Sequence, residues 1–430
     1  MKLKFILLIS LATIVIACQS DSDIAVLQEK EPPASISRQD IVLTSAEKQL
    51  SEQANIFAFK LLKTVYKDKD GNNTNILLSP LSATLAFSML NNGAVGTTGE
   101  EIRQTLGFGN VSSEAINVYA QKIINAMRAL DPQGVFESAN SIWIQQNFPV
   151  LDAFKQVNQQ YYDAEIQNVD FRKPATLKLI NDWASEKTHG KIPEILKEID
   201  PLLTRLILCN ALYFKGYWKE PFDKKHTFDA QFLTSSGTAQ VVPTMKKSFL
   251  SNYVKFGNCS AVELPFGNGA FSLVVVLPDE GADMQEITEH IDYEWWKNIT
   301  DFEKVAIDMH AKNQVYALNL EIPRFKLEYE RTLNNDLMVL GMQTPFDKDV
   351  ADFSLITQDT LFISNVTQKT FARMDEDGME AAAVTVIAML GSSNFEYIPI
   401  DFKVNRPFLY FLKEKSTGLV FFAGVMNKIT

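Results

Sequence analysis

The chain of 430 residues is 46% hydrophobic and 22% charged, which is typical of a globular protein and excludes a fibrous or wholly disordered one. Its formal net charge of −11, with no run of lysine and arginine, argues against nucleic acid as a partner, because phosphate binding needs a concentrated basic surface. The length allows two or three domains, but no internal linker or repeat divides the chain, so we expect one large domain.

The first residues are predicted to be a targeting signal. Lys2 and Lys4 precede an apolar run over 5–17, which is too short to span a bilayer comfortably and ends at Cys18. Over residues 1–17 this pattern resembles a bacterial lipoprotein signal peptide, in which the cysteine is lipidated and becomes the first mature residue. We therefore expect a bacterial lipoprotein on the periplasmic or cell-surface side of the outer membrane, held by the lipid on Cys18, rather than an uncleaved anchor helix.

Residues 18–44 are predicted to be a lipidated tether, because Asp, Glu, Pro and Ser predominate there and large apolar side chains are few. Ordered structure is expected to begin near a one-sided apolar stripe at helical spacing from Leu50 to Val65. The rest of the chain, 45–430, mixes helices and strands without βαβ regularity. It is therefore predicted to fold as one α+β domain.

Local patterns predict the order of the elements. A short strand at 75–78 should run into a helix that Ser79 caps and Pro80 begins. Thr98 and Glu101 are expected to form a capping box for the next helix. Further helices are expected at 113–130, 152–161, 177–188 and 331–340, and strands at 138–145, 165–170, 206–214, 261–264, 271–277, 315–322, 407–412 and 419–425.

The strand at 206–214 is apolar almost throughout, which is the signature of a strand covered on both faces. Asn210 within it must be hydrogen-bonded, since an unpaired buried amide would cost a few kcal/mol. Cys209 and Cys259 match no metal-ligand spacing and lie among apolar residues, which favours buried free thiols over a disulfide. The sequence leaves the redox state of these two cysteines open.

The sequence carries no motif for catalysis or for binding a metal or cofactor. It contains no Gly-x-Ser-x-Gly, no His-Glu-x-x-His and no P-loop. The acidic runs at 100–101 and 375–377 lie where caps and turns favour carboxylates. We therefore expect a protein that is not an enzyme and that uses neither a metal nor a cofactor. The histidines, none of which has metal-ligand spacing, are His189, His226, His290 and His310.

The stretch 375–394 is locally undecided between helix and strand. Three alanines favour a helix, whereas Val384 to Ile387 favour extended structure. A sequence that suits both a loop and a buried strand can belong to two states of one protein. As a strand with a period of two, the stretch would carry one face of uncharged residues, which are Met379, Ala381, Ala383, Thr385, Ile387 and Met389.

Five motifs, in order along the chain, resemble the serpin family of serine protease inhibitors. The resemblance covers about 50–428 and implies a single α+β domain with three β-sheets, eight or nine helices and an exposed reactive-centre loop at about 376–400. The motifs are NILLSPLS from Asn75, NDW from Asn181, NALYFKGYW from Asn210, EDGMEAAA from Glu376 and NRPFLY from Asn405.

In that family a serine protease attacks a bait bond in the loop and forms an acyl-enzyme. It is trapped when the cleaved loop inserts as a central strand of the largest sheet, an established case of strand insertion. The resemblance therefore implies a monomeric suicide inhibitor whose partner is a serine protease, with a papain-like cysteine protease as an alternative target. The competing interpretation is a non-inhibitory member of the family that binds a ligand or partner.

The resemblance also implies roles for particular residues. Met379 stands where the family usually has a small hydroxyl residue, and Gln368 stands where many members have a histidine. The amide of Gln368 can still donate and accept hydrogen bonds. Trp218 matches the place where the loop first inserts. The hinge is implied to be Glu376, Gly378, Met379, Glu380, Ala381, Ala382 and Ala383, and the sheet-opening cluster Ser79, Ser82, Asn210, Trp218 and Gln368.

Counting from Gly378 by the family's usual loop length puts the reactive bond at Ser392-Ser393. The small residues there suit a protease with a shallow specificity pocket, such as an elastase-like or subtilisin-like enzyme. An Arg-specific target is not expected, because no Lys or Arg occurs between Arg373 and Lys403. The loop is longer than usual, so three other bonds remain alternatives, and these are Met389-Leu390, Leu390-Gly391 and Gly391-Ser392.

Overall fold

The computed structural model describes residues 37–68, 74–251, 253–379 and 395–430. Among these residues, no helix combines the length and the apolar character needed to cross a bilayer. The predicted signal peptide and most of the predicted tether lie outside the described residues. So do several predicted site residues, which are Cys18, Glu380, Ala381, Ala382, Ala383, Met389, Leu390, Gly391, Ser392 and Ser393.

The sheet that carries the candidate site, called the main sheet below, has six strands in the order β11-β12-β13-β4-β2-β3. Its long strands β2 and β4 are antiparallel neighbours. The short strand β13 lies between β12 and β4 and pairs with both. The strands are β2 (Val135–Gln145), β3 (Glu165–Val169), β4 (Leu206–Tyr217), β11 (Phe325–Thr332), β12 (Thr367–Asp375) and β13 (Gly378–Met379).

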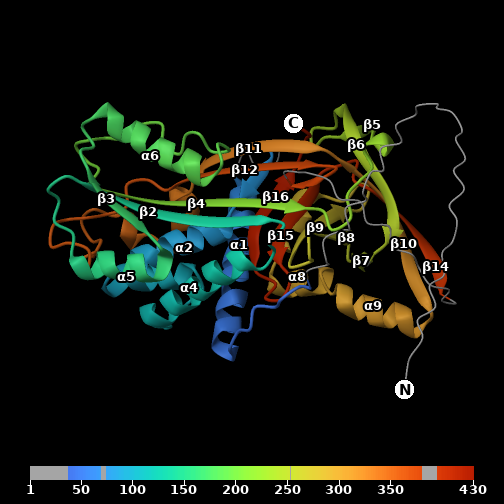
Figure 1. The fold of residues 1–430 in the computed structure, drawn as a ribbon, viewed down its shortest axis with the longest axis horizontal. Helices are drawn as coiled ribbons and strands as arrows, with labels where there is room; N and C mark the ends of the chain where they lie inside the picture. Colours follow the sequence, from blue (N-terminus) through green and yellow to red (C-terminus); the bar gives the residue numbers. More distant parts are fainter. Residues whose placement is uncertain (1–36, 69–73, 252, 380–394) are drawn as a thin grey trace, which may run out of the picture. The chain divides into compact units, whose positions relative to one another are not determined.

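Helices cover both faces of β2 and β4 (Figure 1). On one face α6 (Pro174–Lys187) closes a small core that includes Trp183 and Cys209. On the other face lie α2 (Pro80–Asn91) and α4 (Ser113–Ala129). The prediction that the apolar strand near Cys209 is covered on both faces is therefore confirmed.

The second sheet lies at the centre of the core and has the order β1-β16-β15-β9-β8-β7. Every residue of β9, β15 and β16 is buried. The strands predicted at 407–412 and 419–425 are confirmed as β15 and β16, which pair in antiparallel fashion. The strands are β1 (Ile76–Leu78), β7 (Tyr253–Phe256), β8 (Cys259–Pro265), β9 (Phe271–Pro278), β15 (Phe408–Glu414) and β16 (Val420–Met426).

The third sheet has the order β14-β10-β6-β5, with β14 parallel to β10. The predicted loop at about 376–400 thus leaves the main sheet after β13 and reaches the third sheet at β14. Within that range, the described residues at both ends belong largely to strands. The strands of the third sheet are β5 (Phe228–Leu233), β6 (Ala239–Leu250), β10 (Gln314–Pro323) and β14 (Glu396–Lys403).

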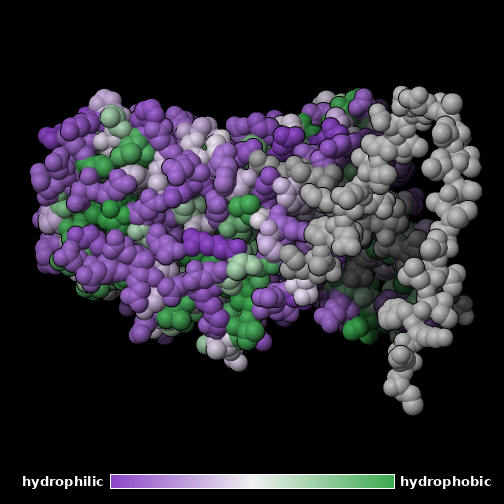
Figure 2. Space-filling view, viewed as in Figure 1, coloured by the Kyte–Doolittle hydropathy of each residue, from purple (hydrophilic) through white to green (hydrophobic). Residues whose placement is uncertain are grey.

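The first helix, α1 (Ser45–Lys67), begins at a capping box formed by Thr44 and Glu47. Its apolar stripe packs in the main core, as the sequence predicts. On the face shown in Figure 2 the described surface is mostly hydrophilic, with small apolar patches between polar groups. The other helices are α3 (Gly96–Thr105), α5 (Asp152–Tyr162), α7 (Met284–Glu289), α8 (Tyr293–Ile299), α9 (Phe302–Ala311), α10 (Asn334–Val339) and the 3-10 turns η1 (Lys224–His226) and η2 (Thr344–Phe346).

The predicted capping box of Thr98 and Glu101 is wrong. The helix α3 begins earlier, after Val95, which makes no side-chain capping bond. The Thr98 hydroxyl accepts the backbone N–H of Asp352 at 2.9 Å. The Glu101 carboxylate accepts the backbone N–H of Thr344 at 2.6 Å. Both polar groups serve tertiary contacts, which local sequence does not reveal.

The helix predicted at 331–340 is too long at its start. The strand β11 continues to Thr332, and α10 covers only Asn334–Val339. Arg331 lies opposite Gln368 in the ladder between β11 and β12. Its guanidinium donates to both carboxylate oxygens of Asp336, at 2.6 and 2.7 Å. Pairing across the sheet outweighs the local helical propensity of this stretch.

Cys209 and Cys259 are buried and free, as predicted. Burial raises the pKa of the Cys209 thiol to about 12 and that of Cys259 to about 11. Neither residue is therefore a reactive thiolate near neutral pH.

Candidate functional site at the hinge and the sheet opening

The turn that leads from β12 into β13 is called the hinge turn below and comprises residues 375–378. Gly378 lies opposite Tyr217 of β4, and its φ of +150° favours glycine. A Cβ atom on Gly378 would lie 2.2 Å from the carbonyl oxygen of Gly216. Only glycine therefore lets the chain approach β4 closely enough to pair there.

Backbone hydrogen bonds fasten the hinge turn to the segment that follows β4. The backbone N–H of Trp218 donates to the carbonyl of Asp377 at 3.0 Å, and its indole N–H donates to the carbonyl of Asp375 at 2.9 Å. The backbone N–H of Phe222 donates to the carbonyl of Glu376 at 2.9 Å. The Trp218 ring is stacked on Phe266 with a centroid distance of 4.6 Å. Trp218 thus holds the hinge turn through its backbone and its indole N–H.

Two ion pairs add to these contacts. The Glu376 side chain is only 2% exposed and pairs with Arg324, and it also accepts from the Thr227 hydroxyl. Asp377 pairs with Lys224 at 2.5 Å. Burial acts to raise the pKa of Glu376, but the hydrogen bonds from Arg324 and Thr227 outweigh it, so the pKa is lowered. Glu376 is therefore a charged anchor at neutral pH.

Met379 already lies within the main sheet. It is opposite Met374 of β12 and Gly216 of β4, and it is 5% exposed. It borders a small cavity of about 20 Å³ together with Phe214 and Phe371. The first residue of the predicted inserting face is thus buried, with its backbone paired on both sides.

Beyond the two residues of β13, a gap separates β4 from β12. At the end of this gap away from the hinge turn, Ser79 and Gln368 form the centre of the predicted cluster. The Ser79 backbone N–H donates to Gln368 Oε1 at 2.9 Å, and Gln368 Nε2 donates back to the Ser79 carbonyl at 2.8 Å. The Ser79 hydroxyl donates to the carbonyl of Phe421 at 3.0 Å and accepts the backbone N–H of Ser82. Ser79 therefore caps α2 and serves the cluster at once, and the amide of Gln368 both donates and accepts.

The side chain of Asn210 in β4 forms hydrogen bonds with the neighbouring strand β2 and not across the gap. Its Nδ2 donates to Asn140 Oδ1 at 2.7 Å and to Ser138 Oγ at 3.2 Å. Its buried Oδ1 has no hydrogen-bond partner among the described residues. The prediction that Asn210 is hydrogen-bonded is thus met on one side of the amide only. An unpaired buried acceptor costs free energy of folding. A donor that entered the gap beside this oxygen would remove that cost.

A cavity of about 450 Å³ fills the gap between β4 and β12. Ser82, Asn210 and Gln368 all line it, so three members of the predicted cluster face one space. Trp218 does not belong to this group. It follows Asn210 by eight positions along the strand, which is about 26 Å at about 3.3 Å per residue. The predicted cluster is therefore two sites, one at each end of the gap.

The anchors Thr227, Lys224 and Arg324 were not predicted. The sequence did show two acids, Glu376 and Asp377, but a turn explains such acids without any partner. Their cationic partners are distant in the sequence, so no local signal links them. Among the described residues, no group of three or more His, Cys, Asp or Glu side chains is arranged to hold a metal ion.

The chain is similar to one protein family over most of its length. A family model described as "Serpin (serine protease inhibitor)" matches residues 52–429. Serpin B6 from Pongo abelii is 33% identical over 383 residues, covering 87% of this chain and 98% of that protein. Leukocyte elastase inhibitor A from Rattus norvegicus is 32% identical over 389 residues, with the same coverage. The native-state crystal structure of the thermophilic serpin Tengpin shares 30% identity and a TM-score of 0.76, covering 92% of this chain and 98% of that one.

Proposed function

The chain belongs to the serpin family, and on that premise we propose that it traps a serine protease by inserting its cleaved loop into the main sheet. The observation that carries this proposal is the gap between β4 and β12. Because β13 is antiparallel to both strands, β4 and β12 run parallel, and within the described part of the chain they are joined through the two residues of β13. A longer strand in that place would complete the sheet.

The register of β13 supports the proposal. Met379 lies opposite Gly216 and Met374, so continuing the pairing by six residues would bring Thr385 opposite Asn210 and Gln368. All three side chains would lie on the same face of the sheet. The Thr385 hydroxyl could then donate to the unpartnered Oδ1 of Asn210. Insertion would therefore satisfy an acceptor that the uninserted sheet leaves unpaired.

The free energy available from insertion is of the required size. Residues 378–392 as a strand would span about 50 Å at about 3.3 Å per residue, enough to carry an attached protease along the length of a domain. Their ladder hydrogen bonds, at about 1 kcal/mol each, would supply on the order of 10–15 kcal/mol. This is comparable to the stability of a whole domain, about 5–15 kcal/mol. Insertion could therefore distort a bound protease.

The proposed target is an elastase-like or subtilisin-like serine protease, with a papain-like cysteine protease as the alternative. The support is the small residues at the proposed reactive bond Ser392-Ser393 and the similarity to leukocyte elastase inhibitor A. We also propose that the inhibitor acts as a monomer at the surface of a bacterial outer membrane, held by a lipid on Cys18. The sequence pattern over 1–18 is the support for that part.

Incubation with elastase and with subtilisin tests the proposal. The expected product is an adduct that survives SDS, with the C-terminal peptide of the loop released. Mass spectrometry of that peptide should place cleavage within 389–394, after Ser392 in the first instance. Cleavage solely after Phe395 or Tyr397 would move the target class toward chymotrypsin-like enzymes.

The same incubation separates the two interpretations of the family. A non-inhibitory member that binds a ligand or partner would have its loop cut and would release active protease. Complete cleavage without any adduct, by every protease of the small-residue class, would therefore refute the proposed trapping mechanism. A catalytically inactive protease variant serves as the control, because it cannot form the acyl-enzyme and should give no adduct.

A further inference from the structure

The segment that follows the proposed bait is fastened to the end of α9, which lies beside β10 (Figure 1). The ring of Phe395 lies 5.3 Å from the ring of His310, measured between centroids. The backbone N–H of Glu396 donates to the carbonyl of Asn313 at 2.8 Å, and Gln314 Nε2 donates to the Glu396 carboxylate at 2.8 Å. Three contacts therefore fix the chain at this point.

These contacts limit how far an attached protease can lie from α9. Ser393 precedes Phe395 by two residues, so their Cα atoms lie within about 7 Å of each other. For the most distant alternative bond, Met389-Leu390, the limit between Leu390 and Phe395 is about 18 Å. A protease domain of about 200 residues has a radius of gyration of about 16 Å. A protease bound at any of these bonds therefore has surface within reach of α9.

Exposed apolar and aromatic side chains occur at this place. Ile307 of α9 is 61% exposed and lies three positions before His310, so the two side chains are neighbours on the helix surface. Tyr397 of β14 is 50% exposed and follows Phe395 by two residues. The four residues Ile307, His310, Phe395 and Tyr397 are called the rim patch below.

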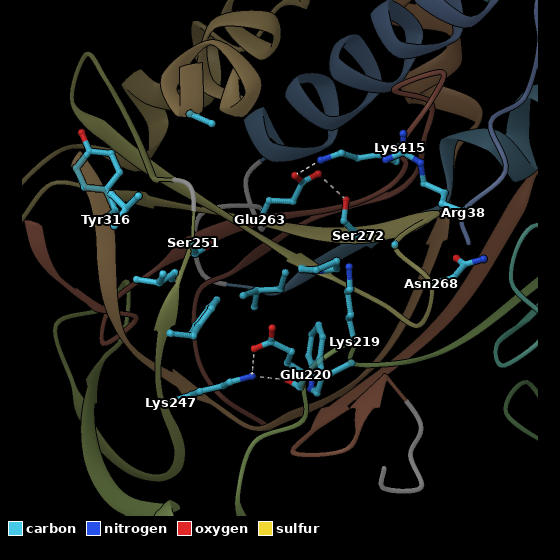
Figure 3. A pocket seen from close by; sticks show the side chains of 18 of the residues that line it. Arg38, Lys219, Glu220, Lys247, Ser251, Glu263, Asn268, Ser272, Tyr316 and Lys415 are labelled. Carbon is cyan, nitrogen blue, oxygen red and sulfur yellow. Dashed lines mark hydrogen bonds and ion pairs between the residues drawn. The ribbon is translucent and has the colours of Figure 1, made fainter. Parts of the chain in front are cut away.

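The inner side of α9 already has partners in the fold, whereas Ile307 does not. Phe302 is 2% exposed and belongs to the main core, and Met309 borders a cavity together with Tyr316 (Figure 3). Ile307 neither belongs to that core nor lines the cavity. The packing of the described residues therefore leaves its side chain available to a partner protein.

The proposed bait needs such a second contact. Ser392 and Ser393 carry few apolar atoms, so they bury little surface in the specificity pocket of a protease. In protein interfaces a few side chains supply most of the binding free energy, and tyrosine is prominent among them. A tyrosine and an aliphatic side chain close to a weak bait are thus placed to supply the affinity that the bait lacks.

We propose that the rim patch is a docking surface for the target protease and contributes to the choice of target. It would contact the protease beside the binding cleft, on the side of the leaving peptide, and the partner that fits it is a serine protease with apolar side chains there. The identity of this partner rests on the proposed function. The contact belongs to the encounter before acylation, because insertion of the cleaved loop would carry the protease away from α9.

Binding to catalytically inactive elastase and inactive subtilisin tests the docking surface without any trapping. The double variant Ile307→Gln with Tyr397→Gln should raise the Kd for at least one of these enzymes fivefold or more in a calorimetric titration. Its melting temperature should match that of the parent, because both side chains are at the surface. No measurable binding of the parent to either enzyme would overturn the proposal.

The matched control is Val339→Gln with Val350→Gln, at two valines that are 75% and 58% exposed. Val339 lies in α10, which follows the end of β11 farthest from the hinge turn. Val350 follows η2. The control should bind both enzymes within twofold of the parent. Equal weakening in the control and in the rim-patch variant would also overturn the proposal.

Active enzyme separates docking from trapping. At limiting enzyme, the rate at which the loop is consumed, counting adduct and cleaved chain together, should fall at least fivefold in the rim-patch variant. The fraction of consumed chain that forms adduct should stay the same. A lower adduct fraction at an unchanged rate would assign these residues to insertion and overturn docking. The rate of consumption can be measured even if the parent forms no adduct, so failure of the trapping mechanism and failure of the rim patch give different results.

Discussion

The side chain of Met379 is 5% exposed and lies between β4 and β12, so substitution there tests the direction of the proposed inserting face. Met379→Arg would place a charge among Phe214 and Phe371 without a partner, at a cost of several kcal/mol. We expect the variant to fold and its loop to be cut, but to trap few protease molecules per loop cleaved. Gel quantification of adduct against cleaved inhibitor measures this ratio.

Met379→Leu is the matched control, because it keeps a similar volume and should cost less than about 1.5 kcal/mol. The leucine variant should trap protease nearly as well as the parent. The arginine variant should also lose most of the gain in melting temperature that loop cleavage gives the parent. If it traps as efficiently as the parent, then the inward face does not begin at Met379 or the loop does not insert.

Glu263 of β8 offers a test of electrostatics in the core. Burial acts to raise the pKa of Glu263, but Lys413 at 3.1 Å and Lys415 outweigh it and lower the pKa to about 2. A lowered folded-state pKa means stability that is present above the ordinary pKa of 4.5 and lost as pH falls toward 2. The parent should lose up to about 3 kcal/mol from this group across that interval.

Glu263→Gln should therefore be less stable than the parent at pH 7, and the difference should shrink steadily between pH 4.5 and pH 2.5. Urea unfolding at several pH values measures it. Glu294→Gln is the control, because Glu294 is 72% exposed in its pair with Lys297 and should change stability little at any pH. A difference between parent and Glu263→Gln that stays constant with pH would contradict the assignment.

At the residue scale, sequence reasoning succeeded where a role is local. Ser79 caps its helix and Gln368 uses both ends of its amide, and both follow from the chemistry of those side chains. It failed where the partner is distant. Thr98 contacts Asp352, and Asn210 contacts Asn140, and only the folded chain brings these pairs together.

Two ion pairs, Glu376 with Arg324 and Asp377 with Lys224, hold the hinge turn, and Arg324 is the member most open to test. Its partner Glu376 is 2% exposed, while Arg324 itself is 41% exposed, so solvent weakens the pair. Arg324→Ala leaves a buried carboxylate with the Thr227 hydroxyl as its remaining side-chain partner. We expect a loss of about 1–3 kcal/mol in the free energy of unfolding and faster hydrogen exchange at 375–379.

A distant exposed pair provides the control for Arg324→Ala. Lys178 and Asp182 form an ion pair on α6 with exposures of 75% and 60%, so Lys178→Ala should cost less than about 0.5 kcal/mol and leave the hinge amides unchanged. Equal exchange at 375–379 in the parent and in Arg324→Ala would show that the backbone bonds from Trp218 and Phe222 hold the turn without the ion pair.

At the scale of elements, the sequence predicted buried strands better than edge strands. β9, β15 and β16 are apolar at nearly every position, and their patterns were unambiguous. β11 alternates apolar and charged residues and carries Glu330 and Arg331 just before its last residue, and these two residues also suit a helix. β13 has two residues, too few for any pattern. This strand forms because Gly378 allows a close approach to β4 and because β12 and β4 lie on either side of it, and the local sequence does not reveal that arrangement.

At the scale of the molecule, the family resemblance predicted the three sheets and the single domain, because five separated motifs fix one topology. Composition alone predicted only a large α+β domain. The gap between β4 and β12 could not be predicted from the sequence of either strand, because neither sequence shows which strand lies beside it. The unpaired space belongs to the assembled sheet, and the resemblance alone indicated which segment would fill it.

The start of the chain allows a test of the tether as a passive spacer. The predicted tether ends at residue 44, yet Leu43 is 8% exposed in the core, and the Ile41 backbone N–H donates to Ser416 Oγ at 2.9 Å. Thr44 caps α1. A chain lacking 1–36 keeps these contacts, whereas a chain lacking 1–44 loses all of them.

We expect the chain lacking 1–36 to match the full protein in stability and in its rate of trapping elastase, because it loses the proposed anchor and keeps the domain to which we assign inhibition. The chain lacking 1–44 should trap protease at the same rate at low temperature but should be less stable by about 2–4 kcal/mol. Burial of a leucine contributes about 1.5–3 kcal/mol of this and a helix cap about 1 kcal/mol. Urea unfolding and adduct formation, measured on both truncated chains, separate the two effects. If removal of 1–36 abolishes trapping while stability is unchanged, the tether takes part in inhibition and is not a spacer.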